Sequence, residues 1–106
     1  MRKKRPLVGV GVIIVKNGRV LLGKRKNSHG SGAWQFPGGH LEYSESVFDC
    51  GLREVTEETG LTIHNLRAGP YTNDFFRDDG KHYITLYVIA DWKRGEPKVL
   101  EPEKCE

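Results

Sequence analysis

The 106-residue sequence predicts a single domain of the α/β class. Three patterns support this class: a hairpin signal near the N-terminus, a stretch with helical periodicity in the middle, and a long apolar strand pattern towards the C-terminus. With 37% hydrophobic and 29% charged residues, the composition is that of a folded globular protein. No apolar run approaches the roughly 18 residues that a membrane-spanning helix needs. We therefore expect no membrane association.

The hairpin signal is an Asn-Gly pair between two apolar runs. Residues 8–15 are rich in β-branched side chains, and Asn17-Gly18 separates them from residues 20–22. Both residues of an Asn-Gly pair tolerate the positive φ of a type I′ turn. The sequence therefore predicts a β-hairpin.

A loop and a glycine turn follow. The stretch "NSHGSGAW", residues 27–34, is rich in Gly and Ser and predicts a loop, with Trp34 as a packing residue. In "QFPGG", Pro37 cannot sit inside a central strand because it lacks a backbone donor. Gly38 and Gly39 permit a close backbone approach or an unusual φ.

A helix is predicted from Ser44 or Ser46, either of which can act as the N-cap, to Thr59, with Gly60 as the C-terminal stop. Glu54, Glu57 and Glu58 are expected on a separate arc, roughly 120° from the apolar positions. The apolar positions recur with helical spacing and predict one buried stripe, made of Phe48, Leu52, Val55 and Thr59.

The remainder predicts extended chain. Residues 61–63 and 68–76 have strand character, and Asp79-Gly80 marks a turn. Residues 82–92 are apolar or aromatic on both faces, which is typical of a central strand that is covered on both sides.

The three glutamates of the predicted helix crowd like charge onto one short stretch. Glu54 and Glu58 repel each other at i, i+4, and carboxylates near a helix C-terminus oppose the helix dipole. A solvated acidic face is one explanation. A divalent cation is the other, because clustered carboxylate oxygens suit Mg²⁺, which also binds substrate phosphates.

The surrounding residues favour the cation. They match the pattern GX5EX7REUXEEXGU, in which U is aliphatic, through Gly39, Glu45, Arg53-Glu54-Val55, Glu57-Glu58 and Gly60-Leu61. This pattern resembles the signature of the Nudix hydrolases. The segments "GVGV", "LLGKRK", "WQFPGGHLE" and "EPEKCE" further resemble the MutT-like branch that acts on nucleoside triphosphates.

The resemblance implies an α/β/α sandwich with a mixed sheet. MutT-like relatives continue past a segment like "EPEKC" into another strand and a closing helix. We therefore expect a C-terminally shortened sandwich that lacks this strand and helix. Such a sandwich would expose one sheet face, so we also expect homodimerisation or low stability.

The resemblance also implies roles for individual residues. Glu54, Glu57 and Glu58, with the backbone of Gly38, would bind Mg²⁺ or Mn²⁺, and Arg53 and Glu45 would orient these ligands. The general base would be Glu57, Glu58 or a carboxylate outside the signature, such as Glu101 or Glu103. The residues expected to bind substrate are Arg25, Gly38, Gly39, Phe75 and Thr85, and Tyr83 and Tyr87 are further candidates for a base pocket.

The charge distribution and the cysteine and histidine content indicate which partners and which cellular compartment to expect. Residues 1–6 form a basic tail and residues 7–106 the domain; the tail lacks interleaved aromatic residues, so we do not expect a nucleic-acid partner. Cys50 and Cys105 fit neither a disulfide framework nor a metal site, which favours the cytoplasm. The four histidines show no ligand spacing: His29, His40, His64 and His82.

The function expected from the resemblance is Mg²⁺-dependent hydrolysis of a nucleoside diphosphate-linked substrate. A nucleoside triphosphate or an oxidised dNTP would yield the monophosphate and pyrophosphate. One alternative is a non-catalytic Nudix-fold module that binds nucleotide or RNA. Another is a hydrolase of a different substrate, such as ADP-ribose.

Overall fold

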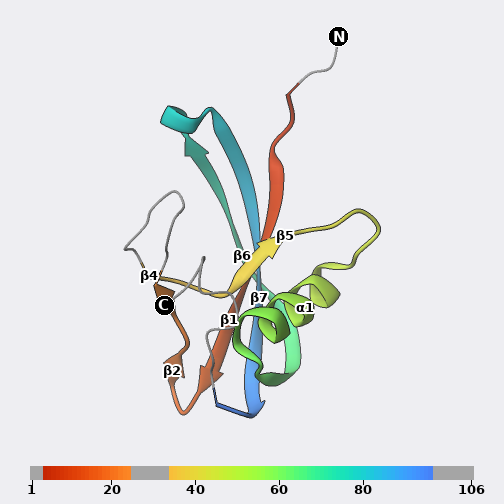
Figure 1. Cartoon of the computed structure of the whole chain (residues 1–106), viewed down its shortest axis with the longest axis vertical. Helices are drawn as coiled ribbons and strands as arrows, with labels where there is room; N and C mark the ends of the chain where they lie inside the picture. The colour runs from red at the N-terminus through yellow and green to blue at the C-terminus, as the bar shows by residue number, and fades with distance from the viewer. Residues whose placement is uncertain (1–3, 25–33, 97–106) are drawn as a thin grey trace.

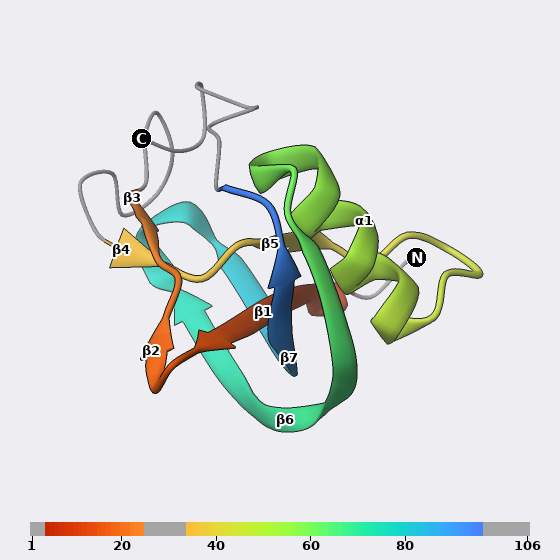
Figure 2. The same ribbon diagram turned by 90° about the horizontal axis from the view of Figure 1, so that it is seen from below.

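The computed structural model describes residues 4–24 and 34–96. In this part of the chain a mixed sheet has the strand order β2-β1-β7-β6, with β5 also paired to β1, and β3 and β4 form a separate two-stranded sheet. One helix, α1, lies across one face of the main sheet (Figures 1 and 2). The elements are β1 (Leu7–Lys16), β2 (Arg19–Val20), β3 (Gly23–Lys24), β4 (Trp34–Gln35), β5 (Gly38–His40), α1 (Val47–Thr59), β6 (Thr62–Phe76), the 3₁₀ turn η1 (Arg77–Asp79) and β7 (Lys81–Arg94).

The predicted α/β class and mixed sheet are confirmed. β1 runs parallel to β7, whereas β2, β5 and β6 join the sheet through antiparallel pairs. Among the described residues, no helix has the length and apolar character needed to cross a membrane.

The predicted hairpin joins β1 to β2. Asn17 and Gly18 have φ values of 53° and 75°, as a type I′ turn requires, and Val15 pairs with Val20. β2 is only two residues long, because the chain then leaves the main sheet to form β3. Most of the predicted Gly/Ser loop lies outside the described residues, while Trp34 belongs to β4.

β7 is central, as predicted, because it pairs with β1 on one side and with β6 on the other. On the face towards α1 its buried residues are Val88 and Ala90, whereas Ile84 and Leu86 on the same face are only partly buried. The opposite face, which carries Tyr83, Thr85 and Tyr87, is partly exposed. The prediction that both faces are covered is therefore wrong for this part of the chain.

β6 is one long strand where the sequence predicted two extended segments. Its register against β7 shifts three times, and Asn65 adopts a φ of 54° at one of these shifts. Asn tolerates this left-handed conformation better than most residues. The irregularities allow one strand to continue through a sequence without regular alternation.

The helix begins and ends at local signals. Ser46 is the N-cap, and its hydroxyl oxygen accepts a hydrogen bond of 3.0 Å from the Asp49 amide. Ser44, the other predicted cap, lies outside the helix with a φ of 66°. Gly60 ends the helix in the left-handed conformation, with a φ of 72°.

The predicted buried stripe of α1 is only half correct. Val55 and Thr59 are buried, but Phe48 and Leu52 keep 40% and 39% of their surface exposed. The helix instead rests on Gly51, where a Cβ atom would lie 3.2 Å from Val12 Cγ2. The buried face is therefore centred closer to the glutamates, and its residues are Cys50, Gly51, Glu54, Val55, Glu58 and Thr59.

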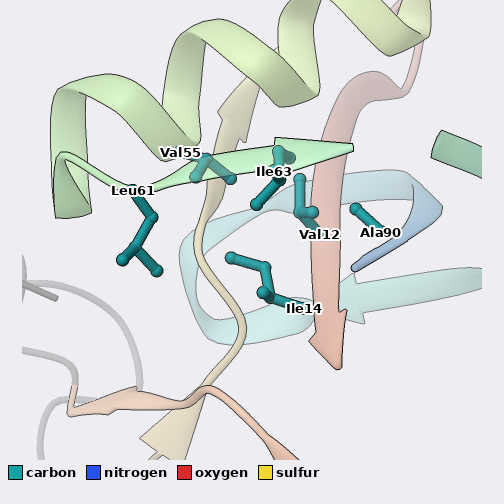
Figure 3. Close-up of a cluster of buried hydrophobic side chains, with 6 residues drawn as sticks. All are labelled: Val12, Ile14, Val55, Leu61, Ile63 and Ala90. Carbon is teal, nitrogen blue, oxygen red and sulfur yellow. The ribbon is translucent and has the colours of Figure 1, made fainter. Parts of the chain in front are cut away.

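The main core lies between α1 and the sheet. Figure 3 shows Val55 of the helix above side chains from β1, β6 and β7. A fully buried aliphatic side chain of this kind contributes about 1.5–3 kcal/mol. The cluster consists of Val12, Ile14, Val55, Leu61, Ile63 and Ala90. A second, smaller cluster of Val10, Cys50 and Val88 fixes the N-terminal half of the helix.

Candidate active site

The glycine turn lies directly beneath the helix. β5 pairs with β1 so that Gly38 is opposite Gly11 and Gly39 is opposite Val10. Residues that face each other across an antiparallel pair share a face of the sheet, so position 39 points towards α1. A Cβ atom there would overlap the Glu54 carboxylate, which means that only glycine fits.

Arg53 and Glu45 form a two-point ion pair beside this turn. Arg53 Nε lies 2.8 Å from Glu45 Oε2, and Arg53 Nη2 donates to Glu45 Oε1 at 3.0 Å. The Glu42 amide donates to the same Glu45 oxygen at 3.1 Å. A planar guanidinium fits a carboxylate in this way and fixes its own orientation. The structure thus joins the two residues that the sequence paired, and their role as orienting residues stays a prediction.

This ion pair changes the pKa of both partners in the direction that favours charge. The hydrogen bonds from Arg53 lower the pKa of Glu45 from 4.5 to about 2. Glu45 in turn raises the pKa of Arg53 further above its usual range. Both side chains are therefore ionised throughout the physiological pH range.

Glu54 is a buried carboxylate with an incomplete set of partners. It is 5% exposed, and Arg53 Nη1 donates to its Oε2 at 3.0 Å. Its Oε1 has no hydrogen-bond partner among the described residues. A buried charged oxygen without a donor is costly. The position therefore suits a cation that would complete its coordination.

The other two glutamates differ in exposure. The Glu57 side chain keeps 46% of its surface exposed and receives Arg53 Nη1 at 3.4 Å, so one guanidinium nitrogen contacts both Glu54 and Glu57. Glu58 is 5% exposed on the same helix. Arg53 thereby fixes two of the three carboxylates relative to each other.

The residues fit a divalent cation without forming a complete cage. In residues 4–24 and 34–96, no three His, Cys, Asp or Glu side chains converge as a ready-made metal site. Mg²⁺ does not require one, because it usually keeps several waters and takes one or two carboxylates plus substrate phosphates. The unpartnered oxygen of Glu54 and the adjacent glycine backbone are the candidate contacts for such an ion. The ligand set of Gly38, Glu54, Glu57 and Glu58 stays a prediction.

His40 is a site residue that the sequence interpretation missed. Its carbonyl oxygen accepts a hydrogen bond of 3.2 Å from Arg53 Nη2 and one of 3.5 Å from the Cys50 thiol. Searching the histidines for metal-ligand spacing could not identify His40, because it contributes its main-chain carbonyl oxygen to the site. The position of His40 directly after the glycine pair was the available signal.

Cys50 is inert at this place. It is fully buried, and burial, assisted by the negative charge of Glu45, raises the pKa of its thiol to about 11. A thiol with so high a pKa is a poor nucleophile and a poor metal ligand. Cys50 acts as a small packing residue under the Arg53 side chain.

The predicted substrate residues do not form one group. Thr85 and Phe75 lie on opposite faces of the hairpin made by β6 and β7, because Phe75 pairs with His82 and side chains alternate along a strand. Phe75 is 57% exposed and stacks on His82 with ring centroids 4.4 Å apart. Phe75 and Thr85 therefore do not share a face of the sheet, and their roles in substrate binding stay a prediction. Arg25, Glu101 and Glu103 lie outside the described residues.

Comparison with known proteins assigns the family. The family profile described as "NUDIX domain" matches residues 5–106. The crystal structure of a MutT NUDIX hydrolase from Burkholderia pseudomallei is similar with a TM-score of 0.91 and 34% identity, covering 97% of this chain and 80% of that chain.

Two curated relatives carry different activities in their names. An ADP-ribose pyrophosphatase from Methanocaldococcus jannaschii is 39% identical over 101 residues, which are 93% of this chain and 59% of that protein. The chain thus spans less than two thirds of this relative. An 8-oxo-dGTP diphosphatase from Proteus vulgaris is 34% identical over 96 residues, covering 88% of this chain and 83% of that protein. The signature, the sheet with its helix and these similarities agree: the chain belongs to the Nudix family and resembles its MutT-like members.

Proposed function

We propose that the protein hydrolyses a nucleoside triphosphate to the monophosphate and pyrophosphate with the help of a divalent metal ion, with Mg²⁺ preferred. The observation that carries the proposal is the buried Glu54 carboxylate, in which one oxygen is fixed by Arg53 and the other has no hydrogen-bond partner among the described residues. The similarity to a diphosphatase for 8-oxo-dGTP supports an oxidised dNTP as one substrate.

The residues of this chain would bind the divalent cation and orient its ligands. When bound, a divalent cation neutralises phosphate charge and lowers the pKa of a coordinated water. Glu54 and the backbone of Gly38 would hold it, and Arg53 would keep Glu54 in place through its own pairing with Glu45. Gly38 and Gly39 let β5 lie close to β1 and to Glu54, because a Cβ atom at either position would clash.

Glu57 is the proposed general base. It is the signature glutamate whose side chain stays half exposed, whereas Glu54 and Glu58 are buried. A base must reach the water from which it takes a proton. In the proposed reaction the water oxygen bonds to a phosphorus of the diphosphate linkage, the bridging P–O bond breaks, and Glu57 receives the proton.

The nucleoside is proposed to lie on the partly exposed face of β7. Thr85 and Tyr87 lie on this face beside Tyr83, and their hydroxyl groups and the Tyr87 ring suit hydrogen bonding and stacking with a base. Phe75 has no part in this surface, because it lies on the other face.

ADP-ribose is the second candidate substrate. The identity of 39% to an ADP-ribose pyrophosphatase favours it specifically. The bond that breaks is again a diphosphate linkage, so the same carboxylates would serve.

The test is a product analysis. The wild-type protein is incubated with dNTPs, 8-oxo-dGTP and ADP-ribose, with and without Mg²⁺, and the released phosphate species are identified by chromatography. Glu57→Gln is expected to lose at least about a hundredfold in kcat, within the range of a general base. Asp78→Asn, an exposed change in η1, is the control. Absence of turnover with every substrate, or full activity of Glu57→Gln, contradicts the proposal.

Metal binding is tested separately by thermal unfolding. Mg²⁺ is expected to raise the unfolding midpoint of the wild-type protein, because a ligand that binds only the folded state stabilises it. Glu54→Gln keeps the shape of the side chain but removes its charge, so its midpoint should not respond to Mg²⁺. An equal response in both proteins would show that Glu54 is not a ligand.

A further inference from the structure

Phe36 and His40, which flank the glycine turn, both contact side chains of β7. His40 Nε2 lies 2.9 Å from the Tyr83 hydroxyl, and the two rings are 5.5 Å apart. Phe36 meets the Tyr87 ring edge-on, with centroids 5.9 Å apart and planes at 78°. Tyr83 and Tyr87 are four residues apart on one strand, so both side chains stand on the same face.

These contacts pass over β1, which lies between β5 and β7 in the sheet. The positions of β1 beneath them are glycines. A Cβ atom on Gly11 would come 2.6 Å from the Tyr87 ring, and one on Gly9 would meet the Thr85 hydroxyl oxygen at 3.6 Å. The absence of a side chain on Gly11 thus leaves room for the Tyr87 ring, whereas a Cβ atom on Gly9 would make only an ordinary contact.

His40 connects this face to the carboxylates on the other face. Its side chain bonds to Tyr83, while its carbonyl oxygen accepts hydrogen bonds from Arg53 Nη2 at 3.2 Å and from the Cys50 thiol at 3.5 Å. Arg53 is the group that fixes Glu54 and Glu45. A change in the orientation of His40 would therefore shift the Arg53 guanidinium, and with it the Glu54 carboxylate.

We propose that Tyr83 is a positioning residue for hydrolysis, and that it acts through the hydrogen bond between its hydroxyl group and His40. This hydrogen bond holds the strand that carries Gly39 against Glu54, and it holds the carbonyl group that receives Arg53. The inference rests on the proposed function, since it assigns a role in arranging the same carboxylates.

The test measures metal affinity without nucleotide. Mn²⁺ binding is followed by electron paramagnetic resonance in the wild-type protein, Tyr83→Phe, His40→Ala and the double variant. Each single variant is expected to bind Mn²⁺ about three- to tenfold more weakly, below the loss seen when a direct partner of a ligand is removed. The double variant should be no weaker than the weaker single variant, because both changes remove the same bond. Additive losses would overturn the proposal.

Matched variants separate positioning from general stability. Tyr71→Phe removes a hydroxyl group from a tyrosine of β6 that is 70% exposed, and it should leave Mn²⁺ affinity unchanged. His40→Gln, whose amide can also bond to Tyr83, should retain most of the affinity. Hydrogen exchange of residues 36–41 in the metal-free protein should be faster in Tyr83→Phe than in the wild type. Unchanged exchange together with unchanged Mn²⁺ affinity would overturn the proposal.

Kinetics distinguish this role from direct contact with substrate. A positioning residue lowers kcat while KM for the nucleotide stays nearly constant. A rise in KM alone, with Mn²⁺ affinity intact, would show that Tyr83 contacts the nucleoside and would refute the proposed role. A wild-type protein that binds Mn²⁺ but hydrolyses nothing would refute the proposed function, whereas weaker Mn²⁺ binding by Tyr83→Phe would still support the positioning bond.

Discussion

Gly39 leaves the space that the carboxylate of Glu54 occupies, because a Cβ atom at position 39 would overlap its oxygens. Gly39→Ala must therefore displace either β5 or Glu54. We expect a loss of roughly 1–3 kcal/mol in the free energy of unfolding, as is typical of an overpacked site, together with loss of metal binding. Urea unfolding and Mn²⁺ titration measure the two effects. Gly9→Ala is the matched control, because its Cβ would meet only ordinary contacts; equal effects of the two variants would contradict the explanation.

The two-point contact between Arg53 and Glu45 should matter more than the charge of Arg53. Arg53→Lys keeps the charge but cannot form both hydrogen bonds, so kcat/KM is expected to fall by about ten- to a hundredfold. Arg67→Lys is the control, because Arg67 pairs with Asp91 on the surface at 3.2 Å. Steady-state kinetics on a substrate that is turned over provide the measurement. Comparable losses in both variants would argue against a specific role for the bidentate pair.

Glu45 should make stability depend on pH in the acid range. Its pKa is lowered from 4.5 to about 2 in the folded protein by the hydrogen bonds from Arg53. Between these values the unfolded chain binds the proton more strongly, so the free energy of unfolding rises with pH. The contribution is fully present above pH 4.5 and is lost as the pH falls towards 2.

Urea titrations between pH 2 and pH 5 test this dependence. Glu45→Gln should show a shallower decline in unfolding midpoint on acidification than the wild type. Glu42→Gln removes a carboxylate from the same loop without touching the pair with Arg53, and it should keep the wild-type decline. A wild-type slope in Glu45→Gln would refute the assignment.

The Cys50 thiol should be unreactive in the folded protein. It is fully buried, and burial together with the charge of Glu45 raises its pKa to about 11. In a Cys105→Ser variant, Cys50 is the only thiol left. Its reaction with a thiol reagent at pH 8 is expected to proceed at the rate of local opening and to become immediate in denaturant. Rapid modification of the folded protein would contradict the burial of this side chain.

Local signals in the sequence were sufficient for some of the turns and helix ends. Asn17-Gly18 produced the type I′ turn, and Gly60 ended the helix, because each conformation depends on the residue itself. Ser46 was one of two predicted caps, and only the folded loop excluded Ser44. The pair of Arg53 and Glu45 was available only through the family signature, since the two residues are eight positions apart in the sequence.

The spacing of apolar residues could not predict how α1 is rotated on the sheet. Helical spacing indicates which residues share a face, but the depth of contact depends on the partner surface. Gly51 allows α1 to approach Val12 closely, and this contact turns Phe48 and Leu52 outwards. Likewise, alternation along a strand could not show that Phe75 and Thr85 lie on opposite faces, because that depends on the register between β6 and β7.

The Tyr87 ring of β7 packs directly against Gly11 of β1. The ring fills the space that a side chain at position 11 would need, so a larger residue at position 11 requires a smaller one at position 87. The two positions are therefore expected to vary together among proteins of this fold: a side chain on the first strand should accompany a smaller residue on its parallel neighbour. Such an exchange would change the shape of the partly exposed face of β7. It would leave the carboxylates of α1, on the opposite face of the sheet, in place.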